Sequence, residues 1–257
     1  MTQPKNIYIT GDLHGNYFPI KEFYYEHKDE LYQKAENNIM ILLGDVGANF
    51  YLNNKDEYFK TKLSLFPFTY FCIRGNHEER PSFLASKFLD KWHQEMRFGN
   101  LVWVENKFPN ILYALDEGGE YDIEGNKTLV IPGAYSVDKW YRLANNLTWF
   151  PEEQLNDEEK IQLIKKIKSS YDYILSHTCP LNWQYNISDL FLPQVDQSKV
   201  DKSTEKFLNE VINKTHWKRW YFGHYHKDRD FVDEKATMLF HSVIPFGQSL
   251  SDYNYYN

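Results

Sequence analysis

Residues 39–45 read Ile-Met-Ile-Leu-Leu-Gly-Asp, an uninterrupted apolar run that leads into a glycine and an aspartate. Such a run is typical of a strand covered on both faces, as in a parallel sheet. Similar apolar runs occupy residues 6–10 and 68–73, and each of them also leads to a glycine. Helical patterns over residues 17–33 and 55–65 separate the three runs. This alternation of strand and helix predicts an α/β layered fold.

The rest of the chain continues with strands and helices in a less regular order. Further helices are predicted at 80–93, 157–168 and 203–213. Further strands are predicted at 101–105, 111–115, 129–132, 171–175 and 219–222, and a hairpin joins 231–232 to 238–243. The strands at 101–105, 111–115 and 129–132 form a meander or part of a second sheet. Residues 181–202 are expected to form a long loop and residues 252–257 a loose tail. Because no linker or repeat is evident, we expect a single domain over residues 1–257.

The composition excludes several classes of protein. The 257 residues include 29 Lys and Arg against 36 Asp and Glu, a formal charge of −7. This balance makes duplex nucleic acid an unlikely partner, because phosphate neutralisation needs a basic face. No stretch reaches the roughly 18 apolar residues of a membrane helix, and the first residues lack a secretory pattern. Two cysteines, Cys72 and Cys179, are too few for a disulfide framework. We therefore expect a cytoplasmic protein with no membrane partner.

Five of the apolar strand candidates run into polar residues that can bind a metal ion. In α/β sheets, ligands bind beyond the carboxyl ends of the strands. Glycines at these ends let the backbone turn sharply and approach a ligand closely. The polar residues are Asp12, His14, Asp45, Asn76, His77, His177, His224 and His226.

The chemistry of this set is that of a centre for two metal ions. Imidazole and carboxylate together suit Mn, Fe, Zn or Ni, and the lack of thiolates argues against a structural zinc site. Side chains two residues apart in an extended segment, as in Asp12-x-His14 and His224-x-His226, point to the same face. Eight candidate groups exceed the needs of one tetrahedral ion. Two neighbouring ions can share a bridging carboxylate and hold a phosphoryl group between them.

The order Asp-x-His, Gly-Asp, Gly-Asn-His, His and Gly-His-x-His, spread from Gly11 to His226, resembles the calcineurin-like metallophosphoesterases. Residues 11–16 and 74–78 are most similar to the branch of phosphoprotein phosphatases and diadenosine tetraphosphatases. The resemblance implies two central mixed β-sheets flanked by helices. It also implies a metal site at the carboxyl ends of the strands.

The resemblance implies a role for each motif residue. One metal ion would be held by Asp12, His14 and His226, and the other by Asn76, His177 and His224. Asp45 would bridge both ions, and Mn is the expected metal, with Fe, Zn or Ni as alternatives. His77 would lie beside the ions and hydrogen-bond the phosphoryl group or protonate the leaving oxygen. Asn76 would also help to stabilise the charge that develops on phosphorus.

The sequence departs from that branch after Asp45. Ala48 stands where the branch usually has the aspartate that orients the catalytic histidine, and Asn49 stands where it has a phosphate-binding arginine. His77 therefore needs a carboxylate from Glu78 or from a distant residue. These departures weaken the specific assignment to protein phosphatases and leave the two-metal phosphoesterase assignment intact.

Phosphate also needs another cation to replace the missing arginine. Arg74 and Arg142 are the predicted substrate-binding residues, and Lys139 is a further candidate. Arg74 could equally pair with a helix carboxylate. Arg142 lies in the stretch 133–150, which fits either an aromatic cluster or a wall of the substrate site.

The predicted reaction is hydrolysis of a phosphoester by in-line attack of a bridging hydroxide on phosphorus. The first hypothesis is a phosphatase acting on a phosphoprotein or a small phosphate ester. The alternative is a phosphodiesterase or pyrophosphohydrolase acting on a nucleotide, a dinucleotide or nucleic acid. A third hypothesis is a metal-binding scaffold without activity, which is disfavoured because every expected ligand position is filled.

Overall fold

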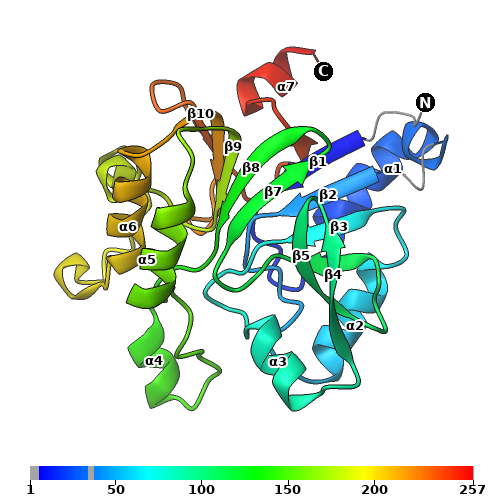
Figure 1. Cartoon of the computed structure of the whole chain (residues 1–257), viewed down its shortest axis with the longest axis horizontal. Helices are drawn as coiled ribbons and strands as arrows, with labels where there is room; N and C mark the ends of the chain where they lie inside the picture. Colours follow the sequence, from blue (N-terminus) through cyan, green and yellow to red (C-terminus); the bar gives the residue numbers. More distant parts are fainter. Residues whose placement is uncertain (1–5, 34–37, 257) are drawn as a thin grey trace.

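Two β-sheets pack face to face, and helices cover the outer face of each sheet (Figure 1). The computed structural model describes residues 6–33 and 38–256. Buried apolar residues gather in three clusters, one between the sheets and one beneath the helices on each outer side. This confirms the predicted α/β sandwich with two mixed sheets.

The first sheet has the strand order β13-β1-β2-β3-β6-β5-β4. Its strands are β1 (Asn6–Thr10), β2 (Asn38–Leu42), β3 (Thr69–Cys72), β4 (Trp92–Arg97), β5 (Asn100–Glu105), β6 (Ile111–Tyr113) and β13 (Ile244–Pro245). The four central strands β1, β2, β3 and β6 are parallel, and the outer strands pair antiparallel. The register places Thr10 beside Leu42 and Leu42 beside Cys72. The carboxyl ends of β1, β2 and β3 therefore lie together.

The second sheet has the strand order β11-β12-β10-β9-β8-β7. Its strands are β7 (Gly119–Ile123), β8 (Asn126–Ile131), β9 (Ser170–Ser176), β10 (His216–Phe222), β11 (Arg229–Phe231) and β12 (Ala236–Met238). The strands β8, β9, β10 and β12 are parallel, so this sheet also has a parallel centre with antiparallel edges. The register pairs Leu175 with Tyr221, which brings the ends of β9 and β10 to one edge.

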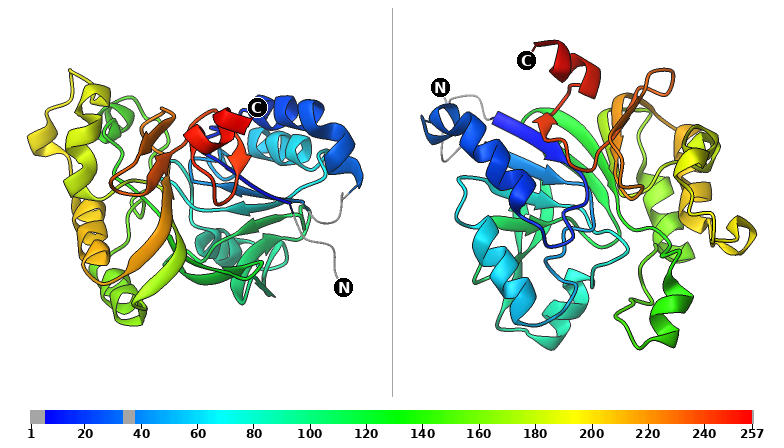
Figure 2. Two further views of the ribbon diagram at one scale, coloured as in Figure 1. Left: turned by 90° about the horizontal axis from the view of Figure 1, so that it is seen from above. Right: turned by 180° about the vertical axis from the view of Figure 1, so that it is seen from behind.

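Helices cover both outer faces, whereas the C-terminal helix packs against the apolar layer between the sheets (Figures 1 and 2). The helices are α1 (Phe18–Gln33), α2 (Asn54–Leu63), α3 (Pro81–Lys87), α4 (Lys139–Ala144), α5 (Asp157–Lys166), α6 (Ser203–Ile212) and α7 (Leu250–Tyr256), with 3-10 segments η2 (Leu181–Leu190) and η3 (Gln197–Lys199). Residues of α1, α2 and α3 belong to the outer cluster of the first sheet. Residues of α5, α6 and η2 belong to that of the second.

The alternation of side chains along β2 explains its continuous apolar run. Ile39 and Ile41 point into the layer between the sheets, whereas Met40 and Leu42 point toward the helices. All four are nearly inaccessible to solvent. A strand covered on both faces needs apolar residues at every position, as the sequence indicated.

The predicted helix at 80–93 is wrong beyond residue 87. Helix α3 ends at Lys87, and residues 92–97 form β4, which pairs antiparallel with β5. The turn between these strands, Phe98-Gly99, has positive φ at both residues (51° and 71°). Two-residue turns of this kind match the twist of a hairpin and fold the chain back on itself. Only Trp92 of β4 is buried, so the strand carries little apolar signal of its own.

Three further predictions need correction. The segment 181–202, predicted as a loop, contains η2 and η3. The tail predicted to be loose forms α7 up to Tyr256, and Asn257 lies outside the described residues. The strands near 101–105 and 111–115 belong to the first sheet, whereas the strand near 129–132 lies in the second, beside the unpredicted strand β7.

Candidate metal centre and active site

The predicted ligands follow strands of both sheets. Asp12, Asp45 and Asn76 come shortly after β1, β2 and β3. His177 directly follows β9, and the pair His224 and His226 follows β10. Because the ends of parallel strands meet at one edge of a sheet, each sheet presents its ligands at a single edge.

A buried group lies at the centre of the site. The possible ligand atoms of Asp12, Asp45 and His177 all lie within 4.8 Å of one another. His177 Nδ1 is 3.5 Å from Asp12 Oδ1, and His177 Nε2 is 3.5 Å from Asp45 Oδ1. Asn76 Oδ1 lies 2.9 Å from His177 Nε2. These four residues come from both sheets and are at most 3% exposed.

A second group of ligand atoms lies on the more open side of Asp45. His14 Nε2 is 2.9 Å from His226 Nε2 and 3.8 Å from Asp45 Oδ2. The His14 side chain is 35% exposed, in contrast to the inaccessible His177. Asp45 thus has one oxygen near His177 and the other near His14, a placement suited to a carboxylate shared between two cations.

Four of the seven predicted ligands adopt a backbone conformation that non-glycine residues rarely take. The φ angles of His14, Asp45, His224 and His226 are 47°, 45°, 71° and 52°. Left-handed backbone costs about 1–2 kcal/mol per residue and persists where the surrounding structure imposes it, often at functional sites. Four of the nine described non-glycine residues with positive φ are therefore predicted metal ligands.

Two glycines are required because neighbouring carboxylates approach the backbone closely. A Cβ atom on Gly75 would lie 2.1 Å from Asp45 Oδ1, and one on Gly223 would lie 2.7 Å from Asp12 Oδ1. Any side chain at these positions would displace the carboxylate. The glycines of the Gly-Asn-His and Gly-His motifs therefore make room for the aspartates of other motifs.

Burial sets the protonation of the outer histidines. It lowers the pKa of His14 to about 4 and the pKa of His224 well below its usual value. Burial also lowers the pKa of His226. An imidazole must be neutral to bind a metal ion. These three side chains are therefore in the ligand form at neutral pH.

The inner residues form a strongly coupled set of opposite charges. Burial alone would raise the pKa of Asp45, but the facing imidazole of His177 lowers it well below its usual value. Burial alone would lower the pKa of His177, but the charge of Asp45 raises it to about 9. Binding of a metal ion at this imidazole would therefore release its proton. Burial raises the pKa of Asp12, and its Oδ1 has no hydrogen-bond partner among the described residues. A buried, unpaired carboxylate oxygen beside imidazole nitrogens fits a divalent cation.

Asn76 is held by residues that the sequence analysis did not identify. Its Nδ2 donates to Ser136 Oγ at 2.9 Å, which turns Oδ1 toward His177. The Ser136 backbone N–H donates to Glu153 Oε1 at 3.1 Å, and Trp149 Nε1 donates to Glu153 Oε2 at 2.9 Å. These residues lie in the loops around α4, where no motif marks them.

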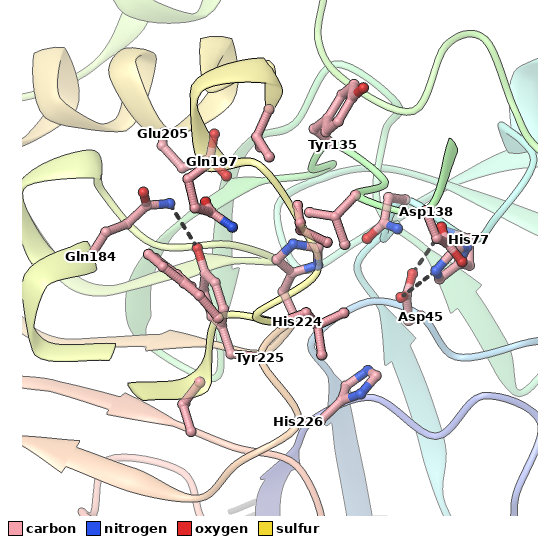
Figure 3. Close-up of a pocket in the computed structure, with 17 residues that line it drawn as sticks. Asp45, His77, Tyr135, Asp138, Gln184, Gln197, Glu205, His224, Tyr225 and His226 are labelled. Carbon is pink, nitrogen blue, oxygen red and sulfur yellow. Dashed lines mark hydrogen bonds and ion pairs between the residues drawn. The ribbon is translucent and has the colours of Figure 1, made fainter. Parts of the chain in front are cut away.

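His77 lies beside the metal residues, as predicted. Its backbone N–H donates to Asp45 Oδ1 at 2.8 Å, and its Nε2 is 4.0 Å from Asp45 Oδ2. Glu78 does not serve as its partner, because its carboxylate accepts from the backbone N–H groups of Gly47 and Gly75. Besides Asp45, the carboxylate of Asp138 lies on the same side as His77, and both residues line the same cavities (Figure 3).

Arg142 lies at the same side of the centre. Its Nε donates to Asp138 Oδ2 at 2.7 Å, and its guanidinium is 5.6 Å from the centroid of the Phe50 ring. Two cavities adjoin the metal residues, with volumes of about 330 and 320 Å³, and His77, Asp138 and His226 line both. Arg142 lines the second. Asp138 and Arg142 thus place a carboxylate and a cation at the cavity that His14, His77 and His226 also line.

The structure does not bring the other two candidate cations to the site. Arg74 is 5% exposed, donates to the carbonyl oxygens of Glu153 and Gly75, and lines neither cavity. This placement favours a structural role. Lys139 lies over the ring of Trp149, 4.2 Å from its centroid, so it belongs to an aromatic cluster.

Comparisons with known proteins point to one family. The model of the calcineurin-like phosphoesterases matches residues 5–228. No curated protein matched the sequence. Solved structures similar to the chain include phosphopantetheinyl hydrolase of Mycobacterium tuberculosis, with 12% identity, a TM-score of 0.45 and coverage of 93% of this chain and 89% of that one. The protein TT1561 of Thermus thermophilus has 12% identity, a TM-score of 0.46 and the same coverage.

The family match spans most of the chain and includes all the motif residues. Within the part of the chain that the structure describes, no helix is long and apolar enough to cross a membrane. The family uses two divalent metal ions, and the cluster of Asp12, Asp45 and His177 provides a possible site for them. The chain belongs to the calcineurin-like phosphoesterases and is a metal-dependent phosphoesterase.

Proposed function

We propose that the protein is a phosphatase that hydrolyses small phosphate monoesters at a dinuclear manganese centre. The observation that carries the proposal is the position of Asp45, with one oxygen beside His177 and the other beside His14. Asp12, His14 and His226 would hold one ion, and Asn76, His177 and His224 the other. When bound, two such cations would lower the pKa of a water between them toward neutrality and neutralise phosphoryl oxygens.

The remaining chemistry belongs to residues around the centre. Asn76, fixed by Ser136, would direct its amide at the phosphoryl group and stabilise charge that develops on phosphorus. His77 would deliver a proton to the leaving oxygen, and Asp138 would orient its ring. Arg142 would bind phosphoryl oxygens, since guanidinium groups recognise them through charged hydrogen bonds.

The first test is the variant Asp45→Asn, assayed with para-nitrophenyl phosphate and added Mn. We expect kcat to fall by about two orders of magnitude or more, because metal-ion catalysis contributes several kcal/mol and each ~1.4 kcal/mol is tenfold in rate. Bound manganese, measured by elemental analysis, should fall as well. The exposed Asp233→Asn is the matched control. Near wild-type activity in Asp45→Asn would refute the bridging role.

A phosphodiesterase or pyrophosphohydrolase is the second candidate. The two cavities on either side of His77 could receive the two substituents of a diester. The panel to compare is para-nitrophenyl phosphate, its bis ester and diadenosine tetraphosphate. A higher kcat/KM for either of the last two would favour this candidate over the monoesterase.

We also propose a cytoplasmic location. Both cysteines are free and buried, as expected where thiols stay reduced.

A further inference from the structure

The cavity of about 330 Å³ extends from the metal residues into a chamber, at whose far end Figure 3 shows Gln184, Gln197 and Glu205. Asp45, Asn76, His77, His224 and His226 line it beside the metal centre. One wall of it is apolar and comes from the segment 190–200: Leu190, Phe191, Leu192, Val195 and Val200. Polar side chains, among them Gln184, Gln197 and Glu205, also line it. The apolar wall therefore comes from the segment 181–202, which the sequence analysis expected to be a long loop.

A carboxyl group also lines this chamber. Glu205, in the first turn of α6, is 3% exposed. Its Oε1 accepts from Thr178 Oγ1 at 3.1 Å, whereas its Oε2 is buried with no hydrogen-bond partner in the described ranges 6–33 and 38–256. A buried polar atom without a partner is costly, and burial raises the pKa of Glu205 to about 7. The Glu205 carboxyl group is unusual because no described residue donates a hydrogen bond to its Oε2.

Several polar residues around Glu205 are engaged with one another, and Gln197 also lines this part of the chamber. Tyr225 Oη is 2.9 Å from Thr178 Oγ1 and accepts from Gln184 Nε2 at 3.1 Å. Lys202 Nζ donates to Gln184 Oε1 at 3.0 Å. This network fixes the polar part of the chamber and leaves Glu205 Oε2 as an acceptor in a pre-formed position. A ligand with a hydrogen-bond donor would satisfy it.

We propose that this chamber is a subsite for the alcohol portion of the substrate, and that it selects an apolar chain or ring bearing a hydrogen-bond donor that meets Glu205. The proposal rests on the proposed function, because it assumes that the phosphoryl group lies at the metal centre. A cavity of about 330 Å³ that combines the metal residues with an apolar wall suits a small organic phosphate. It therefore favours such a substrate over a phosphoprotein.

The test compares two matched series of substrates: n-alkyl phosphates and ω-hydroxyalkyl phosphates of increasing chain length. We expect kcat/KM to rise with chain length in both series. At the length that reaches Glu205, the hydroxyl-ended ester should be preferred by about tenfold or more, since a hydrogen bond to a charged group contributes ~1.5–3 kcal/mol. Equal rates for the two series at every length would overturn the proposal.

Variants at Glu205 test the origin of that preference. In Glu205→Leu the ratio between hydroxyl-ended and alkyl esters should fall to about one. In Glu205→Gln part of the ratio should remain, because the amide oxygen still accepts a hydrogen bond. The exposed Glu210→Gln on the same helix is the matched control and should keep the wild-type ratio. A wild-type ratio in Glu205→Leu would contradict the proposal.

A binding measurement separates the subsite from the reaction. The corresponding ω-hydroxyalkyl phosphonates cannot be hydrolysed, and calorimetry with the manganese-loaded protein measures their affinity. One outcome is that the protein binds these phosphonates selectively, loses that selectivity in Glu205→Leu, and yet hydrolyses no phosphoester. That result would support the subsite and refute the proposed function. Hydrolysis of para-nitrophenyl phosphate without any chain selectivity in rate or binding would refute the subsite alone.

Discussion

Gly75 shows how a single missing side chain shapes the metal centre. We predict that Gly75→Ala lowers both manganese content and activity, because a Cβ atom 2.1 Å from Asp45 Oδ1 must displace that carboxylate. Elemental analysis and the para-nitrophenyl phosphate assay measure the two effects. Gly125→Ala is the control, since its Cβ would meet no atom within 4 Å and its positive φ affects only backbone strain. Full manganese content in Gly75→Ala would contradict the prediction.

Arg142 and Asp138 offer a second prediction for individual residues. We expect Arg142→Ala to raise KM for a phosphate monoester by about tenfold, since a charged hydrogen bond contributes ~1.5–3 kcal/mol. Arg142→Lys should recover part of the loss, because it keeps the charge without the planar fork. Steady-state kinetics measure both. The buried Arg74 provides the comparison: a larger effect on KM from Arg74→Lys than from Arg142→Lys would restore Arg74 as the phosphate ligand.

The positions of the metal residues could be predicted because short motifs follow recognisable strands. Each ligand lies within a few residues of an apolar run, so local sequence places it at a strand end. The residues that orient them could not be predicted in this way. Ser136, Glu153 and Asp138 reach the centre from loops, and only the tertiary fold brings them near Asn76 and His77.

The strand β4 shows where local sequence fails at the scale of an element. Its residues 92–97 contain one buried tryptophan followed by mostly polar, exposed side chains. This sequence shows no period that would distinguish an edge strand from the end of a helix. The pairing with β5 and the turn at Phe98-Gly99 decide the outcome. By contrast, β2 and β3 were predictable because they are covered on both faces.

Helix α6 carries a prediction about pH, because it holds Glu205 in the core. Burial raises the folded pKa of this carboxyl to about 7 from a usual 4.5, and Lys202 and Asp201 are the charged groups that act on it. Ionisation of Glu205 therefore destabilises the folded protein. This destabilisation is absent below about pH 4.5, grows as the pH rises, and is complete above about pH 7. A shift of this size corresponds to at most about 3 kcal/mol.

We predict that Glu205→Gln becomes more stable relative to wild type as the pH rises from about 4.5 to 7. Urea unfolding of both proteins across this range measures the difference. Comparing the two proteins removes the contributions of the other titrating groups. A difference that does not change with pH, or that changes in the opposite direction, would show that Glu205 is not held in a low-dielectric environment.

At the scale of the whole molecule, the predicted metal ligands come from both sheets. Asp12, Asp45 and Asn76 follow strands of the first sheet, and His177, His224 and His226 follow strands of the second. The layer between the sheets, which includes Ile41, Phe71, Leu175 and Tyr221, holds these two sets in register. We expect the two sheets to unfold together as a single domain, since neither sheet retains a complete set of ligands alone.

Phe71→Ala tests this coupling. Phe71 is fully buried between the sheets and contacts the rings of Phe98 and Tyr121 edge to face. Its removal should lower the free energy of unfolding by about 3–5 kcal/mol, whereas the exposed Leu89→Ala should change it by less than about 0.5 kcal/mol. Hydrogen exchange should then accelerate in β9 and β10 as much as in β2 and β3, and manganese affinity should fall. Faster exchange in β2 and β3 alone would contradict the prediction. It would mean that the two sheets unfold as separate units, because the loss of packing between them would leave the stability of β9 and β10 unchanged.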